Sequence, residues 1–195
     1  MIVTLNPSAD AAMISDGANT NYGSETRLWV GEQYGATSLR RSLIKFDLSA
    51  YSGQICSSAK LRIYDTGTDL TNNTRNLIIY RVKRNWGGAT VTWNKYDGTN
   101  SWTTAGCGSP GNDYDNNLVG SVSLPNPPSA GYIEVTITPS YINEWLSGSL
   151  TNYGFCLYTQ SESDDMHEFY SNDNASNRPE LVLTFKSAGY FHMSV

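Results

Sequence analysis

The side chains best suited to catalysis are few in this chain. It contains only 2 histidines, against 13 tyrosines and 5 tryptophans, in 195 residues. Glycoside hydrolysis needs two carboxylates at a fixed separation, and Asp113 with Asp115, or Asp165 with Glu168, are the available pairs. His167 precedes Glu168 but lacks the second histidine of a zinc-protease helix, and neither a nucleophile elbow nor a phosphate-binding loop occurs. The residue types favour binding over catalysis, and we predict no catalytic residue.

Abundant aromatic side chains in polar surroundings favour recognition of sugars or of other proteins. The stretch over residues 97–117 is long and rich in glycine, and binding residues concentrate on loops that a rigid scaffold holds. The ligand-contacting aromatic residues predicted in or beside it are Tyr96, Trp102 and Tyr114. Trp86 and Trp93 flank a Gly-Gly segment, and we interpret them as anchors of the connection in preference to a surface on which a sugar stacks.

Two loops rich in side-chain oxygens suggest a structural calcium ion, because hard cations prefer oxygen ligands. Sandwich folds often bring the first and last strands together, which would unite an early loop with a late one. The candidate metal ligands are Asp16, Asn19, Asn21 and Asp173. No EF-hand spacing occurs, and ordinary turns built on Asx side chains are the alternative. No cofactor is required.

The elements that must position these residues are short strands of alternating polarity, separated by stretches rich in Gly, Asn, Asp and Ser. Residues 40–48 illustrate the period of two, with Ser42, Ile44 and Phe46 on one face and Arg41 and Lys45 on the other. Strands are predicted over residues 1–5, 27–30, 40–48, 59–64, 76–82, 118–123, 132–138, 154–159, 168–170 and 180–186. The turn sequence Thr-Asn-Tyr-Gly occurs twice, at 20–23 and 151–154.

One helix is predicted after residue 138. Thr138 is a suitable N-cap, Pro139 fits the first helical position, and Gly148 ends the helix. Trp145 should face the sandwich. Because strands do not alternate with helices, a parallel α/β sheet is excluded. We expect an all-β protein: a single jelly-roll-like antiparallel β-sandwich with one short helix, over residues 1–186, followed by a tail, 187–195, that could act as a docking segment.

Bulk properties exclude some partners. The formal charge of −5 argues against nucleic acid, which needs a basic face. No apolar run reaches the roughly 20 residues of a membrane span, and the first residues do not resemble a signal peptide. Three cysteines, Cys56, Cys107 and Cys156, show no zinc-type spacing. A disulfide between Cys56 and Cys107, with Cys156 as a buried thiol, is one arrangement among those that the sequence leaves open.

Several stretches, taken in order, resemble the DNRLRE family of bacterial, archaeal and viral β-sandwich domains. This family is related to the archaeal disaggregatase module and is classed among alginate-binding carbohydrate modules. The resemblance spans about residues 8–186. The matching stretches lie at 20–23, 41–49, 59–64, 80–82, 86, 90–94, 145–146, 152–155, 169–171 and 177–183.

The resemblance implies a non-catalytic module displayed outside the cell or on a virion. Family members that bind anionic polysaccharide are thought to use basic and aromatic side chains, and the positions that correspond here are Arg41, Lys45 and Arg62. The predicted function is therefore a surface-displayed binding module whose partner is a polysaccharide or cell-surface glycan. The alternative is a virion decoration or adhesion protein, or another surface-assembly protein, that contacts neighbouring protein copies.

Overall fold

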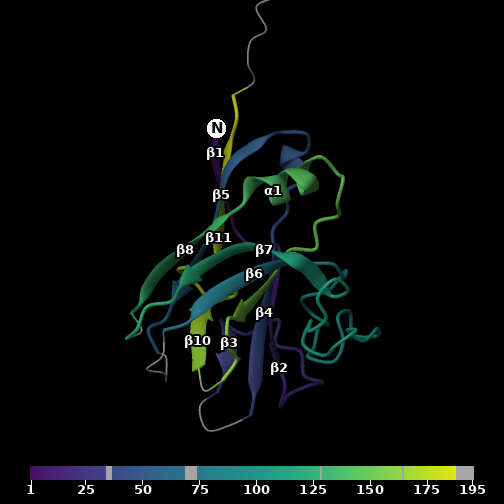
Figure 1. Ribbon diagram of the computed structural model, residues 1–195, viewed down its shortest axis with the longest axis vertical. Helices are drawn as coiled ribbons and strands as arrows, with labels where there is room; N and C mark the ends of the chain where they lie inside the picture. The colour runs from purple at the N-terminus through teal and green to yellow at the C-terminus, as the bar shows by residue number, and fades with distance from the viewer. Residues whose placement is uncertain (34–36, 69–73, 128, 164, 188–195) are drawn as a thin grey trace, which may run out of the picture.

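The computed structural model describes residues 1–33, 37–68, 74–127, 129–163 and 165–187. Strands and one α-helix make up the regular structure of this part of the chain (Figure 1). The strands are β1 (Ile2–Leu5), β2 (Ala9–Ile14), β3 (Arg27–Glu32), β4 (Leu39–Lys45), β5 (Cys56–Asp65), β6 (Asn76–Val82), β7 (Tyr114–Ser123), β8 (Gly131–Ile137), β9 (Phe155–Thr159), β10 (Asp165–Tyr170) and β11 (Glu180–Phe185). A 3-10 turn (Ser49–Tyr51) follows β4, and helix α1 (Pro139–Leu146) precedes β9.

The strands form two antiparallel layers. Hydrogen bonding follows the order β1-β11-β5-β10-β3-β4-β9-β6-β7, with β8 on the other side of β5 and β2 beside β4. The path folds over between β3 and β4, where only Gly31 with Arg40 and Glu32 with Leu39 are paired. One layer therefore contains β1, β11, β5, β8, β10 and β3, and the other contains β2, β4, β9, β6 and β7. This arrangement confirms the predicted all-β sandwich.

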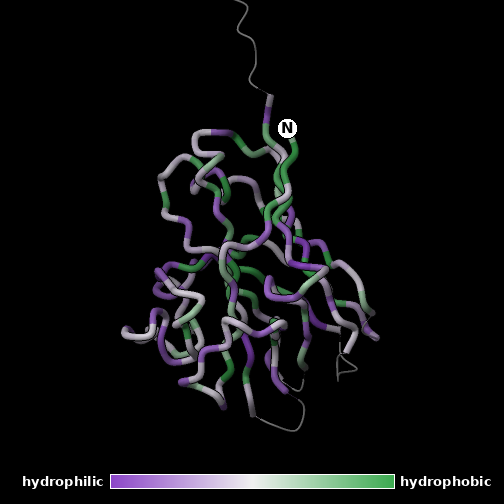
Figure 2. Tube along the Cα trace, turned by 180° about the vertical axis from the view of Figure 1, so that it is seen from behind, coloured by the Kyte–Doolittle hydropathy of each residue, from purple (hydrophilic) through white to green (hydrophobic). Residues whose placement is uncertain are grey.

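The first core lies between the two layers. It contains the inward side chains of both, among them Leu61 and Ile63 of β5, Ile44 of β4, and Leu77 and Ile79 of β6, all completely buried. Apolar segments accordingly run through the middle of the molecule, whereas polar segments gather at its margins (Figure 2). Burial of this apolar surface is the main source of stability expected for such a fold.

A second core covers the outward face of the layer that contains β4 and β9. The connection over residues 83–113 folds back over this face, beside β4 and β2 (Figure 1). Its apolar side chains meet Leu43 of β4 and Cys156 of β9, which are completely buried although they point away from the first core. Trp86 and Trp93 belong to this second core and are 3% and 8% exposed. Their predicted role as anchors of the connection agrees with this packing.

The strand predictions succeed wherever one face of the strand is polar. The strand at 76–82 has the predicted bounds, and most others agree within a few residues. Strand β2 was not predicted. Five of its six residues are buried, so it shows no period of two. Strand β9 is also buried throughout but is apolar and aromatic, whereas β2 has three alanines and an aspartate, residue types that are depleted in strands.

The helix is confirmed. It begins at Pro139 and ends at Leu146, Trp145 is buried as predicted, and Gly148 follows with a positive φ of 76°. Thr138 occupies the N-cap position in an extended conformation, but its side chain makes no capping hydrogen bond.

The two copies of Thr-Asn-Tyr-Gly share one side-chain hydrogen bond, although Gly154 has a positive φ of 80° and Gly23 is not among the positive-φ glycines. The amide oxygen of Asn21 accepts the N–H of Gly23 at 3.2 Å, and that of Asn152 accepts the N–H of Gly154 at 2.9 Å. Each asparagine also donates its amide N–H to the backbone of a distant segment: Asn21 to Val91 and Asn152 to Phe46. The repeated sequence is therefore a reused turn that ties a loop to the sandwich.

Candidate functional site

One sheet face of the sandwich is left open by the described part of the chain. We call it the open sheet face, and it consists of the outward side chains of β1, β11, β5, β8, β10 and β3. Ser58 and Lys60 of β5, Thr136 of β8 and Thr4 of β1 are exposed on it. Much of the equivalent face of the other layer, at β2, β4 and β9, is buried beneath the connection over residues 83–113. Among the described residues, the open sheet face is therefore the more accessible surface for a ligand that binds along a sheet.

Aromatic and arginine side chains form a continuous rank across this face. The ring of Tyr64 on β5 meets Tyr132 of β8 edge to face at 5.2 Å, and stacks on Tyr170 of β10 at 5.4 Å between centroids. The guanidinium of Arg62 lies 4.3 Å from the ring centre of Tyr132, and that of Arg27 lies 4.3 Å from Tyr170. Cation–π contacts and cross-strand aromatic pairs of this kind hold their members in fixed positions. We call these five residues the aromatic–arginine rank.

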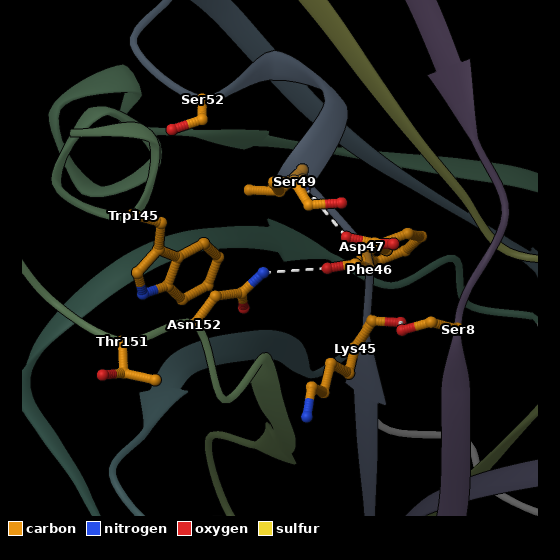
Figure 3. Close-up of a pocket in the computed structure, with 10 residues that line it drawn as sticks. Ser8, Lys45, Phe46, Asp47, Ser49, Ser52, Trp145, Thr151 and Asn152 are labelled. Atoms are coloured by element: carbon orange, nitrogen blue, oxygen red, sulfur yellow. Dashed lines mark hydrogen bonds between the residues drawn. The ribbon is translucent and has the colours of Figure 1, made fainter. Parts of the chain in front are cut away.

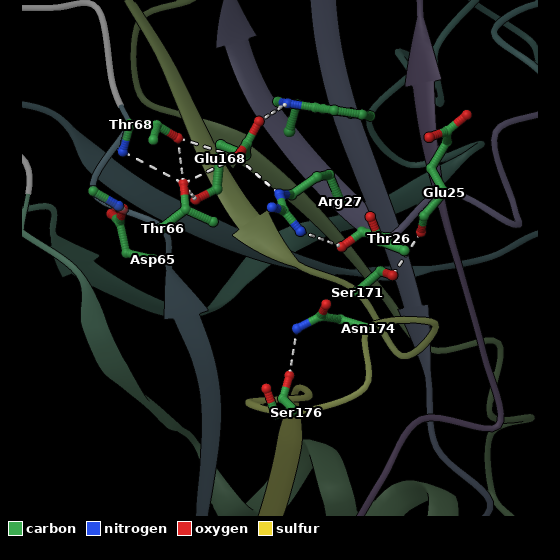
Figure 4. Close-up of polar contacts among 12 residues, drawn as sticks. Glu25, Thr26, Arg27, Asp65, Thr66, Thr68, Glu168, Ser171, Asn174 and Ser176 are labelled. Atoms are coloured by element: carbon green, nitrogen blue, oxygen red, sulfur yellow. Dashed lines mark hydrogen bonds and ion pairs between the residues drawn. The ribbon is translucent and has the colours of Figure 1, made fainter.

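Glu168 of β10 orders the end of the rank that lies on β3 (Figure 4). Its carboxylate accepts hydrogen bonds from Arg27 at 2.9 Å, from the indole of Trp29 at 3.0 Å and from Thr66 at 3.0 Å. Thr68 also donates to it, at 3.1 Å. Burial alone would raise the pKa of Glu168, but these hydrogen bonds outweigh it and lower the pKa. Glu168 therefore stays ionised and positions both Arg27 and Trp29.

A shallow hollow of about 380 Å³ continues the face towards β1. Its lining residues are Ile2, Thr4, Ser58, Lys60, Arg62, Glu134, Val182 and Thr184. Lys60 and Arg62 bind Glu134 at 2.8 and 3.1 Å, and Arg62 also pairs with Glu180. Arg62, which the sequence suggested as a ligand contact, thus joins the hollow to the aromatic–arginine rank.

A second hollow surrounds Lys45 and has a volume of about 480 Å³ (Figure 3). Hydroxyl and amide groups line it, and the Asn152 amide donates to the carbonyl of Phe46 at 2.8 Å. The amine of Lys45, another predicted contact, makes no ion pair with any residue that the structure describes. Trp145 lines the hollow but is only 9% exposed, so little of its ring can reach a ligand.

The aromatic residues predicted as ligand contacts in the long connection pack onto the second core instead. Trp102 is 4% exposed, and its indole N–H donates to the Thr92 carbonyl at 3.1 Å. Because the loop folds down onto the sheet, the Trp102 ring has little exposed surface for a ligand in this structure, and its predicted ligand contact gains no support from this packing. Tyr96 meets Trp102 edge to face at 5.6 Å, and Tyr114 packs against Tyr158 at 5.4 Å. Both are half-buried.

Arg41 is likewise occupied within the protein. Its guanidinium forms two hydrogen bonds with Glu162, at 2.7 and 2.8 Å, and a third with the Gly106 carbonyl at 2.8 Å. It lies over the rings of Trp93 and Tyr158. Burial acts to lower the pKa of Arg41, but the bonds to Glu162 outweigh it and raise the pKa. A ligand could reach this guanidinium only by displacing Glu162.

The four residues proposed for calcium are not gathered into one site. Asp16 accepts a hydrogen bond from Ser38 at 2.7 Å, and Asn19 accepts one from Asn94 at 2.9 Å. Asn21 and Asp173 do line one hollow, as expected for early and late loops that meet. Among the described residues, no group of three or more His, Cys, Asp or Glu side chains could hold a metal ion. Asn19 and Asn21 line another hollow together. A calcium site needs six to eight oxygen ligands, and the structural calcium ion stays a prediction.

Three of the carboxylates considered for hydrolysis, Asp113, Asp115 and Glu168, have structural partners, whereas the side chain of Asp165 lies outside the described part of the structure. Asp113 is completely buried and accepts three backbone N–H groups, and Asp115 pairs with Arg81 at 2.5 Å. The cysteines are all free thiols. Cys107 and Cys156 lie in the second core and Cys56 lies in the first, which is incompatible with the suggested Cys56–Cys107 disulfide.

Most members of the aromatic–arginine rank were missed by the sequence analysis. A signal was present, because Arg62 and Tyr64, Arg27 and Trp29, and Tyr132 and Glu134 alternate with core residues along their strands. The alternation predicts which side chains share a face of a strand, but it does not predict which strands pair. The pairing of β10 with β3 and β5 brings Tyr170 beside Arg27 and Tyr64.

An antiparallel sandwich with one open, polar and aromatic sheet face has the architecture of a binding module. The sequence model of carbohydrate-binding module family 96 matches residues 1–185. The chain therefore belongs to carbohydrate-binding module family 96, a family of non-catalytic modules. No curated protein is significantly similar to it in sequence. No helix in the described ranges is both long enough and apolar enough to cross a bilayer. From residue 188 onwards, the predicted docking tail lies outside the described residues.

Proposed function

We propose that the protein binds a polysaccharide along the open sheet face and acts outside the cell or on a virion surface. The observation that carries this proposal is the aromatic–arginine rank on the sheet face that the described chain leaves open. Five side chains from strands β3, β10, β5 and β8 are held there by contacts with one another. A surface of fixed side chains loses little conformational entropy on binding, which favours recognition of an extended chain.

The hollow at Lys45 is the competing location on the same protein. Its lining includes hydroxyl and amide groups and an amine that makes no ion pair in the described structure, but its one tryptophan is buried. It also receives no contribution from the strands that build the rank. The open sheet face is therefore the better supported of the two surfaces.

Affinity electrophoresis through gels that contain soluble polysaccharides tests the proposal. Tyr64→Ala should lower the affinity for polysaccharide, as measured from the retardation, about tenfold, which is equivalent to about 1.4 kcal/mol. Lys45→Ala should leave this affinity nearly unchanged. Circular dichroism and thermal unfolding would show that each variant is folded. A strong effect of Lys45→Ala with none from Tyr64→Ala would move the site to the Lys45 hollow. Failure of every polysaccharide to retard the native protein would refute the function.

We also propose contact with neighbouring protein copies as a second candidate function, because strand β1 favours it. Among the described strands β1 pairs only with β11, and Ile2 on it is 69% exposed. Residues 2–5 carry no charged side chain, although charges usually protect an edge strand from pairing with another chain. Light scattering coupled to size-exclusion chromatography should detect association that Ile2→Lys weakens, and a strictly monomeric native protein would exclude it.

A further inference from the structure

The charges at the centre of the open sheet face are already balanced. Lys60 and Arg62 share Glu134, Arg62 has Glu180 as a second partner, and Arg27 pairs with Glu168. The contact distances are 2.8 Å from Lys60 to Glu134, 3.1 Å from Arg62 to Glu134 and 2.9 Å from Arg27 to Glu168. Three cations thus face three carboxylates. Arg40, at the margin on β4, lies over Trp29 and bonds to Gln33.

This balance disfavours an anionic ligand. A ligand carboxylate that approached Arg62 would meet Glu134 and Glu180, and one that approached Arg27 would meet Glu168. Like charges at such separations repel, and displacing a partner leaves a carboxylate unpaired. The net charge of −5 on the whole chain adds long-range repulsion. The basic side chains at the centre of the face all have acidic partners, so selective binding of a polyanion would depend on cations at the margin, such as Arg40.

A ligand on the aromatic–arginine rank would contact the edges and hydroxyl groups of the tyrosine rings more than their faces. Strand β10 lies between β3 and β5, so the Tyr170 ring is held between Arg27 on one side and Tyr64 on the other. Among the described residues, the hydroxyls of Tyr64 and Tyr170 have no hydrogen-bond partner, whereas that of Tyr132 donates to the Arg178 carbonyl. A phenolic hydroxyl can both donate and accept a hydrogen bond, which suits the hydroxyl groups of a sugar.

We propose that the ligand of the open sheet face is a neutral, hydroxyl-rich polysaccharide, bound through hydrogen bonds with the Tyr64 and Tyr170 hydroxyls and the paired charges beside them. This inference rests on the proposed function and narrows its ligand class. The carboxylates that neutralise Lys60, Arg62 and Arg27 have a double role. They exclude uronate and sulfate groups, and they present acceptors at the surface.

Matched polymers separate the two ligand classes. Polygalacturonate and its fully methyl-esterified form share a backbone and differ in charge, as do dextran sulfate and dextran, and glucomannan, xylan and galactan add neutral backbones. We expect retardation by at least one neutral polymer and little by the charged member of each pair. Affinity for a neutral ligand should change less than about twofold between roughly 0.05 and 0.5 M salt, because charge screening does not affect it.

Two conservative substitutions test the residues. Tyr64→Phe keeps the ring and removes the hydroxyl, and should weaken neutral binding about fivefold, the loss typical of one hydrogen bond. Tyr141→Phe on helix α1 is its matched control and should have no effect. Glu134→Gln removes the carboxylate shared by Lys60 and Arg62 and should increase retardation by polygalacturonate. Asp47→Asn is the matched control: it changes the net charge by the same amount at a position away from the open sheet face, and it should not increase retardation by polygalacturonate.

The outcomes distinguish the inference from the function on which it rests. Retardation by charged polymers alone, lost at high salt, would overturn the neutral-ligand inference while the proposed function stood. Neutral binding that is insensitive to Tyr64→Phe would also overturn it, because the hydroxyl would have no part in recognition. If none of the polymers retards the protein, the function and the inference both fail.

Discussion

The carboxyl group of Asp10 on β2 is almost completely buried, beside a hollow that it shares with Asp173. Burial raises its pKa from 3.8 to about 6, although the N–H of Asn172 donates to it at 2.7 Å and acts in the opposite direction. The negative charge of Asp173 raises the pKa further. Asp10 therefore takes up protons near neutral pH.

Stability should fall as pH rises through this range. Between pH 3.8 and about 6 the folded protein retains a proton that the unfolded chain releases, so each increase in pH favours unfolding. The full penalty, about 3 kcal/mol above pH 6, should be absent in Asp10→Asn, which keeps an oxygen to accept the Asn172 N–H. Urea unfolding of both proteins from pH 4 to 7 should show that the free energy of unfolding of the variant, relative to that of the native protein, increases with pH. A pH-independent difference would contradict the assignment.

Trp102 contributes to stability through its packing in the second core. Replacing a buried tryptophan with alanine typically costs about 3–5 kcal/mol, and the Thr92 carbonyl would also lose its indole donor. Trp102→Ala should therefore lower the free energy of unfolding by this amount, while the folded fraction keeps its affinity for polysaccharide. Denaturant unfolding and gel retardation measure the two effects. Unchanged stability with lost binding would restore Trp102 as a ligand contact.

At the scale of elements, the connection over residues 83–113 is held down by one carboxylate. Asp113 accepts the backbone N–H groups of Thr103 at 2.9 Å, Thr104 at 3.0 Å and Ser109 at 3.0 Å. Arg84 lies at 3.5 Å. Because these donors come from separate turns of the connection, the Asp113 side chain organises a loop that has little regular structure of its own.

Removing this carboxylate should release the connection before the sandwich unfolds. Asp113→Ala leaves three backbone donors without their acceptor, at about 1–3 kcal/mol for each one that stays buried. We expect faster proteolytic cleavage within residues 97–112 and a loss of stability of several kcal/mol, with Asp113→Asn intermediate. Limited proteolysis followed by mass spectrometry identifies the cleavage sites. Cleavage at an unchanged rate would show that the second core alone retains the loop.

At the scale of the whole molecule, the two cores share strands. Strand β4 sends Ile44 into the first core and Leu43 into the second, and β9 does the same with Leu157 and Cys156. Disruption of either core therefore affects strands on which the other depends. We expect a single unfolding transition, with calorimetric and van't Hoff enthalpies that agree. Two resolved transitions would show that the covered connection and the sandwich unfold separately.

Much of the fold could be predicted from sequence because a strand with one buried and one exposed face alternates apolar and polar residues. The segment over residues 40–48 is an example, since Ile44 and Phe46 enter the first core as predicted. Strand β2 was missed because it does not alternate in polarity and consists mainly of alanine and aspartate, which are depleted in strands. The candidate site was harder to predict. Arg62, Arg41 and Trp102 were all predicted as ligand contacts. Arg62 lies on the open sheet face, whereas Arg41 and Trp102 contact other parts of the chain.

The sequence by itself determined that this protein is an antiparallel sandwich with a helix at Pro139–Leu146, because periodicity and capping are local properties. Only the tertiary structure decided which sheet face remains open. The outward side chains of both layers include tyrosines stacked with arginine, such as Tyr158 with Arg41 and Tyr170 with Arg27, so these residue types do not distinguish the two faces. The difference arises when the connection over residues 83–113 buries one face, and when pairing between strands distant in sequence assembles Arg27, Tyr64 and Tyr170 on the other.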